Sequence, residues 1–212
     1  MVNRFPSWWL GYVLVRGLYL RFGIISLLLI GILCTLSMLM DSYARIDIYI
    51  YGFGCWFFLI APFVANYYIA KNRKQRILSV LEEIKATGYF NPDKNSEGWL
   101  FWTSTYIGFD HKNGTMVYIR VFPGKVMDVI GLDAYSLTKT ETEGGKLSLY
   151  TKLTTMPLIQ LEVGLSSAKS IEATIHAMNN KGYSYNFNFP DIVKQKRQKL
   201  ESLAGMPVPD LI

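Results

Sequence analysis

The sequence predicts a two-helix membrane hairpin followed by an α+β domain built on an antiparallel sheet. Two runs without a charged residue predict the hairpin: residues 22–40, 19 in number, and residues 48–70, 23 in number. The composition changes after Ala70, because the remaining 142 residues carry 18 basic and 14 acidic side chains. Short segments rich in β-branched and aromatic residues, separated by turn signals, predict the sheet in that part of the chain.

Composition excludes several classes of protein. Of the 212 residues, 50% are hydrophobic and only 18% are charged. Disordered chains combine low hydrophobicity with high charge, and collagens need glycine at every third position. Cys34 and Cys55 each lie alone inside an apolar run. Two isolated cysteines predict neither a disulfide framework nor a zinc site.

Each apolar run is long enough to cross a bilayer. A spanning helix needs about 20 apolar residues, because in hydrocarbon its backbone polar groups must be hydrogen-bonded within the segment. Residues 22–40 are too many for the apolar part of a secretory signal and lack a small-residue cleavage pattern at their end, so we expect this run to be retained. Neither run contains Asp, Glu, Lys, Arg or His, which argues against a transporter or a proton relay.

The charges that flank the two runs predict the topology. Three arginines precede the first run and four basic residues follow the second, whereas the connection from Asp41 to Asp47 carries one arginine and two aspartates. The positive-inside rule therefore predicts both termini in the cytoplasm and a short turn outside. Residues 22–70 are expected to form a transmembrane hairpin.

Residues 1–21 interleave aromatic side chains with arginines. The aromatic residues of this segment are Phe5, Trp8, Trp9, Tyr12 and Tyr19. Aromatic rings and arginines collect at the level of lipid headgroups, so we expect an interfacial segment that anchors the hairpin. A helix that binds a partner is the alternative.

Residues 71–95 are expected to form a juxtamembrane helix and a loop. Apolar residues recur there at helical spacing, namely Ile77, Leu81 and Ile84. This spacing predicts an amphipathic helix over residues 76–87, which Gly88 would end.

Six segments that follow predict strands. They span residues 99–109, 115–122, 125–130, 135–141, 146–151 and 158–163. The clearest hairpin has the turn Asp110 to Gly114, because Asn-Gly tolerates positive φ. Apolar and polar residues alternate in residues 158–163, a pattern typical of a sheet with one buried face. A further short strand is expected over Tyr183 to Phe189.

Two helices are predicted near the C-terminus. Ser166 or Ser167 would cap the first, which ends at residues 179–182 and whose apolar face consists of Ala168, Ile171, Ile175 and Met178. The second would begin near Pro190 and stop before Gly205. The order of elements over residues 99–181 resembles the bacterial pleckstrin-homology-like (PH-like) fold, a partly open antiparallel β-barrel of about seven strands with a capping helix. We expect such a domain over residues 96–189 and a basic helix and tail over 190–212.

No pattern in the sequence predicts catalysis, a cofactor or a metal site. His111 falls in the predicted hairpin turn and His176 on the polar side of the predicted helix, each without a second histidine or a cysteine nearby. Gly144-Gly145 joins two strands, which is not the setting of a phosphate loop. The aspartates expected to cap turns at strand ends are Asp110, Asp128 and Asp133. The chain is therefore not expected to be an enzyme.

Two basic clusters are the candidate contact residues. The first, just after the second apolar run, contains Lys71, Arg73, Lys74 and Arg76; the second contains Lys194, Lys196, Arg197 and Lys199. The first is explained by topology alone, and it would also attract anionic headgroups. For the second, the simplest interpretation is a solvated helix face, and the alternatives are docking on the inner leaflet, on an acidic partner or on nucleic acid. The absence of stacking aromatic residues beside it argues against nucleic acid.

The N-terminal run Asn-Arg-Phe-Pro-Ser-Trp-Trp-Leu-Gly-Tyr-Val-Leu-Val-Arg-Gly (residues 3–17), the hairpin and the motif Tyr-Ile-Gly-Phe-Asp (residues 106–110) carry a resemblance. The chain resembles the ExcA type of plasmid entry-exclusion (surface exclusion) protein. The resemblance implies an inner-membrane protein of a plasmid-bearing recipient that prevents redundant conjugative transfer. It implies that the protein recognises a membrane component of the donor's type IV conjugation apparatus. No binding motif defines the family, so the resemblance assigns no site residue.

Two other functions stay open from the sequence. One is a membrane-tethered adaptor whose PH-like domain binds a lipid headgroup or a peptide. The other is an enzyme on the cytoplasmic face whose site the sequence does not reveal. The identity of the partner, the contact residues and the oligomeric state, including a homo-oligomer, are open as well.

Overall fold

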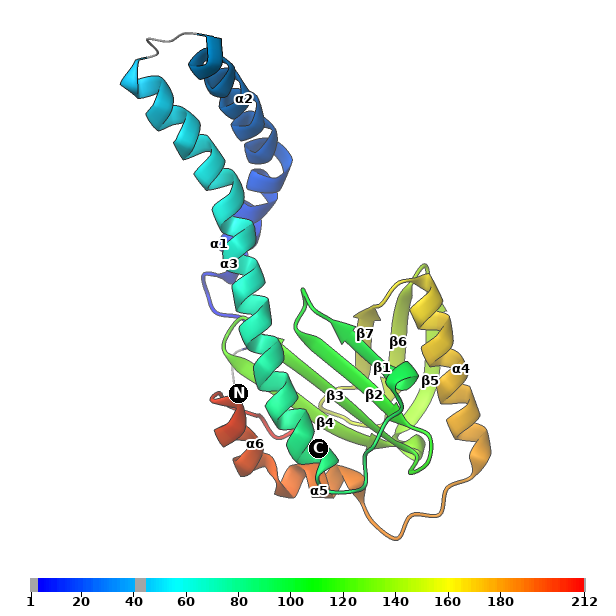
Figure 1. The fold of residues 1–212 in the computed structure, drawn as a ribbon. Helices are drawn as coiled ribbons and strands as arrows, with labels where there is room; N and C mark the ends of the chain where they lie inside the picture. The colour runs from blue at the N-terminus through cyan, green and yellow to red at the C-terminus, as the bar shows by residue number, and fades with distance from the viewer. Residues whose placement is uncertain (1–3, 41–44, 212) are drawn as a thin grey trace. The chain divides into compact units, whose positions relative to one another are not determined.

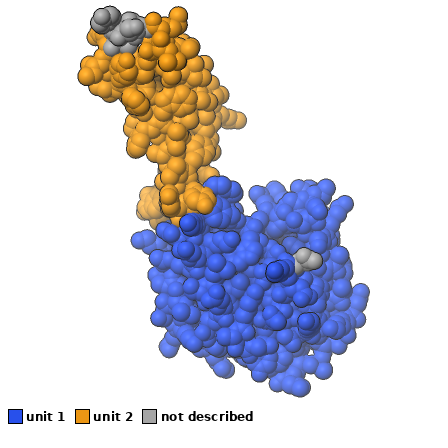
Figure 2. Space-filling view, in the orientation of Figure 1, with its two compact units in different colours: residues 1–4, 70–212 blue, residues 5–69 orange. Residues whose placement is uncertain are grey.

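The computed structural model describes residues 4–40 and 45–211, which form two compact units (Figure 2). Residues 5–69 make up the first unit, here called the helical unit. Arg4 and residues 70–211 belong to the second, here called the sheet domain. The N-terminal Arg4 is therefore part of the sheet domain, although the helical unit separates it from the rest of that domain in the sequence.

The helical unit contains two long helices. α1 (Trp9–Leu18), η1 (Tyr19–Gly23) and α2 (Ile24–Met40) follow one another as one helix, in which η1 is a short π-helical turn. α3 (Ile46–Lys85) begins in the helical unit and continues into the sheet domain. Both helices are long and apolar enough to cross a membrane, and only 6% of each apolar window is buried. The two apolar runs predicted to be helical are helical.

Glycines allow α2 and α3 to approach each other closely. A Cβ built on Gly31 would lie 3.4 Å from Cε2 of Trp56, and one built on Gly52 would lie 2.5 Å from Cε of Met38. The second distance is too short for any larger residue unless Met38 moves. The earlier residue of α2, Gly31, meets the later residue of α3, Trp56, and the later Met38 meets the earlier Gly52, so the two helices pack antiparallel.

Two hydrogen bonds join the same helices. The indole Nε1 of Trp56 donates to Oγ1 of Thr35 at 3.1 Å, and the hydroxyl of Tyr19 in η1 donates to the carbonyl of Phe58 at 2.9 Å. Each bond satisfies a polar group inside an apolar segment, where an unbonded group is costly. Pro62 lies inside α3, and the helix continues past it.

The part of α3 that belongs to the sheet domain is amphipathic. The predicted helix of residues 76–87 is present, but as the last turns of α3, which ends at Lys85. Its buried residues are Ile77, Val80, Leu81 and Ile84. Gly88 has φ of +79°, as expected for the residue that ends the helix. The short 3-10 helix η2 (Lys94–Ser96) then leads to the first strand.

Sheet A has four antiparallel strands in the order β1-β2-β3-β4. They are β1 (Glu97–Leu100), β2 (Thr105–Asp110), β3 (Thr115–Phe122) and β4 (Val126–Asp133). The predicted hairpin turn before Gly114 is confirmed, and Gly114 has φ of +66°. The single strand predicted over residues 99–109 is wrong, because a turn at residues 101–104 folds this segment back into the antiparallel pair β1 and β2.

Sheet B has three antiparallel strands in the order β5-β6-β7. The 3-10 helix η3 (Ala134–Ser136) connects the sheets, and the strands are β5 (Leu137–Glu143), β6 (Lys146–Thr151) and β7 (Leu158–Glu162). In β7, Ile159 and Leu161 are buried while the residues between them are exposed. The predicted sheet with one buried face is therefore confirmed for β7.

Three helices follow: α4 (Leu165–Lys181), α5 (Phe189–Gln195) and α6 (Arg197–Ala204). The four predicted apolar residues are the buried residues of α4. The predicted serine cap is wrong, because Gly164, with φ of +80°, turns the chain directly from β7 into α4 and leaves both serines inside the first turn. The helix expected from Pro190 is divided at Lys196 into α5 and α6, and it ends as expected at Gly205, with φ of +60°.

Residues 183–188 do not form the strand that was predicted there. The alternating Tyr-x-Tyr-x-Phe pattern places aromatic rings beside the β2–β3 turn instead. The hydroxyl of Tyr183 donates to the carbonyl of His111 at 2.8 Å, and that of Tyr185 donates to the carbonyl of Gly114 at 2.6 Å. Side chains, rather than backbone ladder bonds, attach this segment to the sheet.

Sheet A is the central layer of the sheet domain (Figure 1). One face packs against α3, α5 and α6, through residues such as Val117 and Ile119. The other face packs against sheet B and α4, through residues such as Ile107 and Ile130. Every residue of β2 is buried, which follows because both faces of the sheet are covered.

Candidate functional site

An ion pair between Arg4 and Asp128 lies at one end of sheet A. Asp128 is fully buried inside β4, and Nε of Arg4 donates to its Oδ1 at 3.2 Å and lies 3.0 Å from its Oδ2. The backbone carbonyl of Arg4 also accepts a hydrogen bond from the N–H of Gly124 at 3.0 Å. The prediction that Asp128 caps a turn at a strand end is wrong, because this residue lies in the ladder opposite Arg120.

Arg120 lies opposite Asp128 in the ladder, close to the ion pair. The guanidinium groups of Arg4 and Arg120 lie 5.6 Å and 4.8 Å from the ring centre of Phe122. Burial raises the pKa of Asp128, and the positive charge of Arg4 opposes this shift. Arg4 therefore stabilises the ionised form of a carboxylate that burial disfavours. Sequence reasoning missed this pairing because Arg4 and Asp128 are 124 residues apart.

The other two aspartates cap turns, as predicted. Asp110 accepts hydrogen bonds from the backbone N–H of Asn91 at 2.7 Å and of Lys112 at 2.8 Å. Asp133 accepts from both the N–H and the hydroxyl of Ser136 at 2.7 Å. Their carboxylates therefore stabilise loops.

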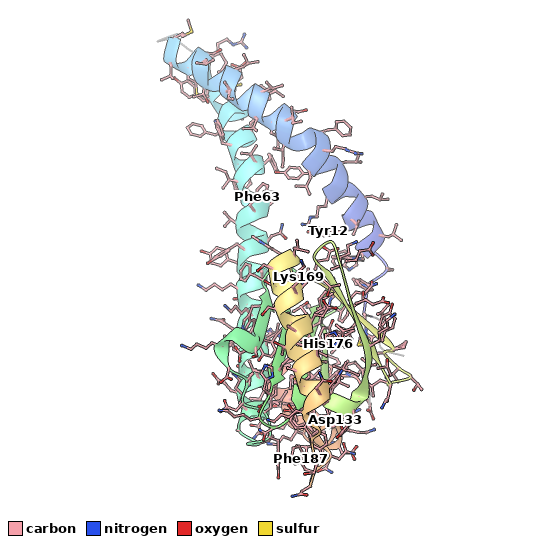
Figure 3. The ribbon with its side chains drawn as sticks, turned by 90° about the vertical axis from the view of Figure 1, so that its right-hand side faces the viewer. Tyr12, Phe63, Asp133, Lys169, His176 and Phe187 are labelled. Carbon is pink, nitrogen blue, oxygen red and sulfur yellow. The ribbon has the colours of Figure 1, made fainter. Side chains whose placement is uncertain are left out.

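The two histidines lie apart from each other. His111 is in the β2–β3 turn, where Nε2 is 3.1 Å from Oγ of Ser96. His176 is exposed on α4, along which Figure 3 also shows Lys169. In the described residues, no three side chains of the types His, Cys, Asp or Glu gather into a possible metal site.

The first basic cluster, Lys71 to Arg76, is partly used in packing. Nζ of Lys74 lies 5.1 Å from the ring centre of Trp99 in β1. Nη1 of Arg76 donates to the carbonyl of Ala204 at 2.9 Å, so it satisfies the C-terminal end of α6. Arg73 is half-buried and Lys71 is exposed. Lys74 and Arg76 thus attach α3 to β1 and to α6, respectively.

The lysines of the second basic cluster, residues 194–199, have different partners in the structure. Lys196 and Lys199 both bind the carboxylate of Glu83 in α3, the latter at 2.7 Å, and these bonds lower the pKa of Glu83. Lys194 pairs with Asp210 at 3.1 Å. Arg197 is half-buried beside Lys194. Two of the four predicted contact residues therefore hold α6 against α3.

Exposed apolar side chains are the remaining candidates for contact surfaces. They cover most of the helical unit, in keeping with its low burial. In the sheet domain the largest exposed fraction among the aromatic side chains described is that of Trp102, at 70%, in the β1–β2 turn. Sequence reasoning had assigned Trp102 to a strand. The polar pair Thr103-Ser104 that follows it was a turn signal that could have revealed its position.

Comparison with known proteins adds one finding. The sequence model of a family described as "Exclusion-determining protein" matches residues 3–211, which is nearly the whole chain. No curated protein and no solved structure matches the chain.

Proposed function

The chain belongs to the exclusion-determining protein family and is an entry-exclusion protein, and from this premise we propose how it acts. It resides in the bacterial inner membrane of a plasmid-bearing cell. There it blocks redundant conjugative transfer by binding a component of the donor's type IV conjugation apparatus. It acts through protein contacts rather than through catalysis. The family match over residues 3–211 carries the proposal.

The low burial of the helical unit supports the membrane location. The core helix of a soluble protein would be mostly buried, whereas the apolar windows here are 6% buried. Large apolar side chains such as Leu33, Phe53 and Phe57 are more than 60% exposed. Exposed surface of this kind is costly in water and favourable in hydrocarbon.

The ion pair between Arg4 and Asp128 supports a hairpin topology. Arg4 precedes the helical unit, Asp128 follows it, and the two residues touch within the sheet domain. Both ends of the helical unit must then lie on one side of the membrane, as two spans require. The basic residues that flank the spans favour the cytoplasmic side.

The size of the connection between the spans bears on where the partner binds. A specific protein interface buries roughly 800 Å² on each partner. The connection predicted to lie outside, from Asp41 to Asp47, is too short for such an area, and residues 41–44 lie outside the described part of the chain. We assign recognition to the sheet domain or to the N-terminal segment.

Expression of the gene alone in a recipient tests the function. We expect fewer transconjugants when the donor carries the same plasmid, and an unchanged frequency when it carries an unrelated one. A recipient that accepts both plasmids normally, with the protein present in its membrane, would contradict the proposal. Exchanging residues 72–212 with those of an exclusion protein of different specificity then tests recognition. If specificity follows the exchanged domain, recognition lies in the sheet domain; if it stays with residues 1–71, recognition by the sheet domain is wrong.

A membrane-tethered adaptor is the second candidate. Four antiparallel strands, then three, then α4 follow one another in the sheet domain, and this order resembles that of the PH-like fold. A domain of this kind would bind a lipid headgroup or a peptide. Selective binding to one headgroup in vesicles, without an effect on conjugation, would favour this candidate over entry exclusion.

A further inference from the structure

One end of sheet A carries both points at which the chain leaves the sheet domain for the helical unit. At the first point, Arg4 accepts a hydrogen bond from Gly124 in the β3–β4 turn. At the second, Lys74, four residues after Ala70, lies over Trp99 in β1. The ladder pairs Leu100 with Thr105 and Phe122 with Val126. The β1–β2 turn and the β3–β4 turn therefore lie at this same end.

The β1–β2 turn presents an aromatic ring to its surroundings. Trp102 is 70% exposed, and its ring touches Phe101 edge to face at 5.2 Å between ring centres. Hydrogen bonds hold the turn: Ser104 N–H donates to the carbonyl of Phe101 at 3.2 Å, and Val121 N–H donates to the carbonyl of Ser104 at 3.0 Å. The exposed tryptophan thus sits on an ordered turn rather than on a loose loop.

The charges at this end of the sheet are mainly positive. Lys125 is exposed in the β3–β4 turn, and Lys71 is exposed beside the point where α3 enters the domain. Arg120 lies on β3 opposite Asp128 in β4, and the carboxylate of Asp128 is buried and paired with Arg4. An exposed indole beside several cations is the combination found where proteins meet anionic lipid headgroups.

We propose that the β1–β2 turn is a second membrane contact of this protein, separate from the spans. Trp102 enters the headgroup region of the anionic cytoplasmic leaflet, and Lys125 lies against the phosphates. This inference rests on the proposed membrane location of the helical unit. A lipid surface is favoured over a protein because one indole offers far less than the roughly 800 Å² of a protein interface. This end of the domain carries both chain connections to the helical unit, so a weak contact is sufficient to orient the sheet domain.

Quenching by spin-labelled lipids tests the contact in the full-length protein. Both native cysteines are replaced by alanine, and an environment-sensitive fluorophore is attached at Trp102→Cys, Lys112→Cys or Phe63→Cys. Lys112 is exposed in the β2–β3 turn, at the opposite end of sheet A, and Phe63 lies in α3 within the apolar run (Figure 3). The proteins are reconstituted in vesicles of phosphatidylethanolamine and phosphatidylglycerol that contain lipids spin-labelled near the headgroup or in the acyl chain.

We expect headgroup-labelled lipids to quench the fluorophore at position 102 several-fold more than the one at position 112. Acyl-chain labels should quench the fluorophore at position 63. If position 63 is quenched while positions 102 and 112 behave alike, the inference is wrong and the membrane location stands. If position 63 is not quenched, the membrane location fails and the inference fails with it.

A charge variant separates lipid contact from simple proximity. Lys125→Glu should reduce the quenching at position 102, because it places a carboxylate against anionic headgroups. Lys112→Glu changes the net charge equally at the far turn and should leave the quenching at position 102 unchanged. Equal effects of the two variants, or the same quenching in vesicles of phosphatidylcholine alone, would overturn the role assigned to Lys125 and the anionic surface.

Discussion

Nε of Arg4 lies 3.0 Å from Oδ2 of Asp128, although 124 residues and the whole helical unit separate the two residues in the sequence. Asp128 is fully buried and the side chain of Arg4 is one-third exposed. Within the described residues, Oδ2 has no hydrogen-bond partner, so the nearby guanidinium is its main compensation. Arg4 is therefore a structural part of the sheet domain.

Removal of Arg4 should destabilise the sheet domain. Arg4→Ala leaves a buried carboxylate without its partner, and we expect a loss of about 1–3 kcal/mol, below the value for a fully buried pair because Arg4 is partly exposed. Thermal unfolding of the full-length protein in detergent measures this loss. Asp128→Asn removes the buried charge, so Arg4→Ala should cost much less in that background. Equal losses in both backgrounds would show that the ion pair does not stabilise the fold.

The buried carboxylate also predicts a pH dependence. Burial raises the pKa of Asp128 above its ordinary value of 3.8. The folded protein then binds this proton more tightly than the unfolded chain does, so stability falls as the pH rises from the ordinary pKa through the raised one. Relative to Asp128→Asn, the unaltered protein should lose stability over this window in thermal unfolding measured from pH 4 upward. A constant difference between the two proteins would contradict the assignment.

The sheet domain should fold without the spans only when it keeps its part of α3. Ile77, Val80, Leu81 and Ile84 cover one face of sheet A. We expect a fragment of residues 70–212 to be soluble, with both strand and helix in its circular dichroism spectrum. A fragment of residues 96–212 should aggregate or unfold, because that face would be exposed.

The fragment of residues 70–212 offers a further check on the ion pair. It lacks Arg4, so Asp128→Asn should raise its melting temperature more than it does in the full-length protein. If the fragment of residues 96–212 proves as stable as the fragment of residues 70–212, the expectation that α3 stabilises the core is wrong.

The hairpin topology predicts where a reporter is active. An alkaline phosphatase inserted after Arg45, between the spans, should be active, because this enzyme needs the oxidising environment outside the cytoplasm. The same enzyme fused after Leu211 should be inactive. Fluorescent-protein fusions at the two positions, which behave in the opposite sense, control for expression. The reverse pattern would place the sheet domain outside the cytoplasm.

Variants of Glu83 separate two roles of the C-terminal basic cluster. Replacing Lys196 and Lys199 by Gln removes positive charge and also breaks their bonds to α3, whereas Glu83→Gln weakens the same bonds and keeps the positive charge. If the cluster contacts a partner, the lysine variant should lose exclusion while Glu83→Gln keeps it. Conjugation frequency, with membrane levels checked by immunoblot, measures the outcome. Equal loss in both variants would indicate that the cluster acts only in packing α6 on α3.

Local patterns in the sequence predicted much of the fold. The two apolar helices, the hairpin around Gly114, the alternation in β7 and the buried face of α4 were all predictable, because periodicity and turn chemistry depend on neighbouring residues. Where local signals compete, sequence reasoning went wrong. The run of residues 99–109 is rich in strand-forming residues, and the turn at Ser104 divides it into β1 and β2. The alternating rings after Lys181 looked like a strand, although side chains make the contacts there.

Packing between distant segments determines which charges lie inside and which lie on the surface. Asp128 resembles the turn-capping Asp110 and Asp133 in the sequence, but the ladder of sheet A buries it and the N-terminus supplies its partner. Lys196 and Lys199 looked like a solvated face until α3 placed Glu83 beside them. The two apolar helices and most of the strands could be predicted from the amino-acid sequence, because they follow from short-range spacing. The pairing of distant charges and the exposed Trp102 depend on how the strands and helices pack, and spacing along the chain does not encode that packing.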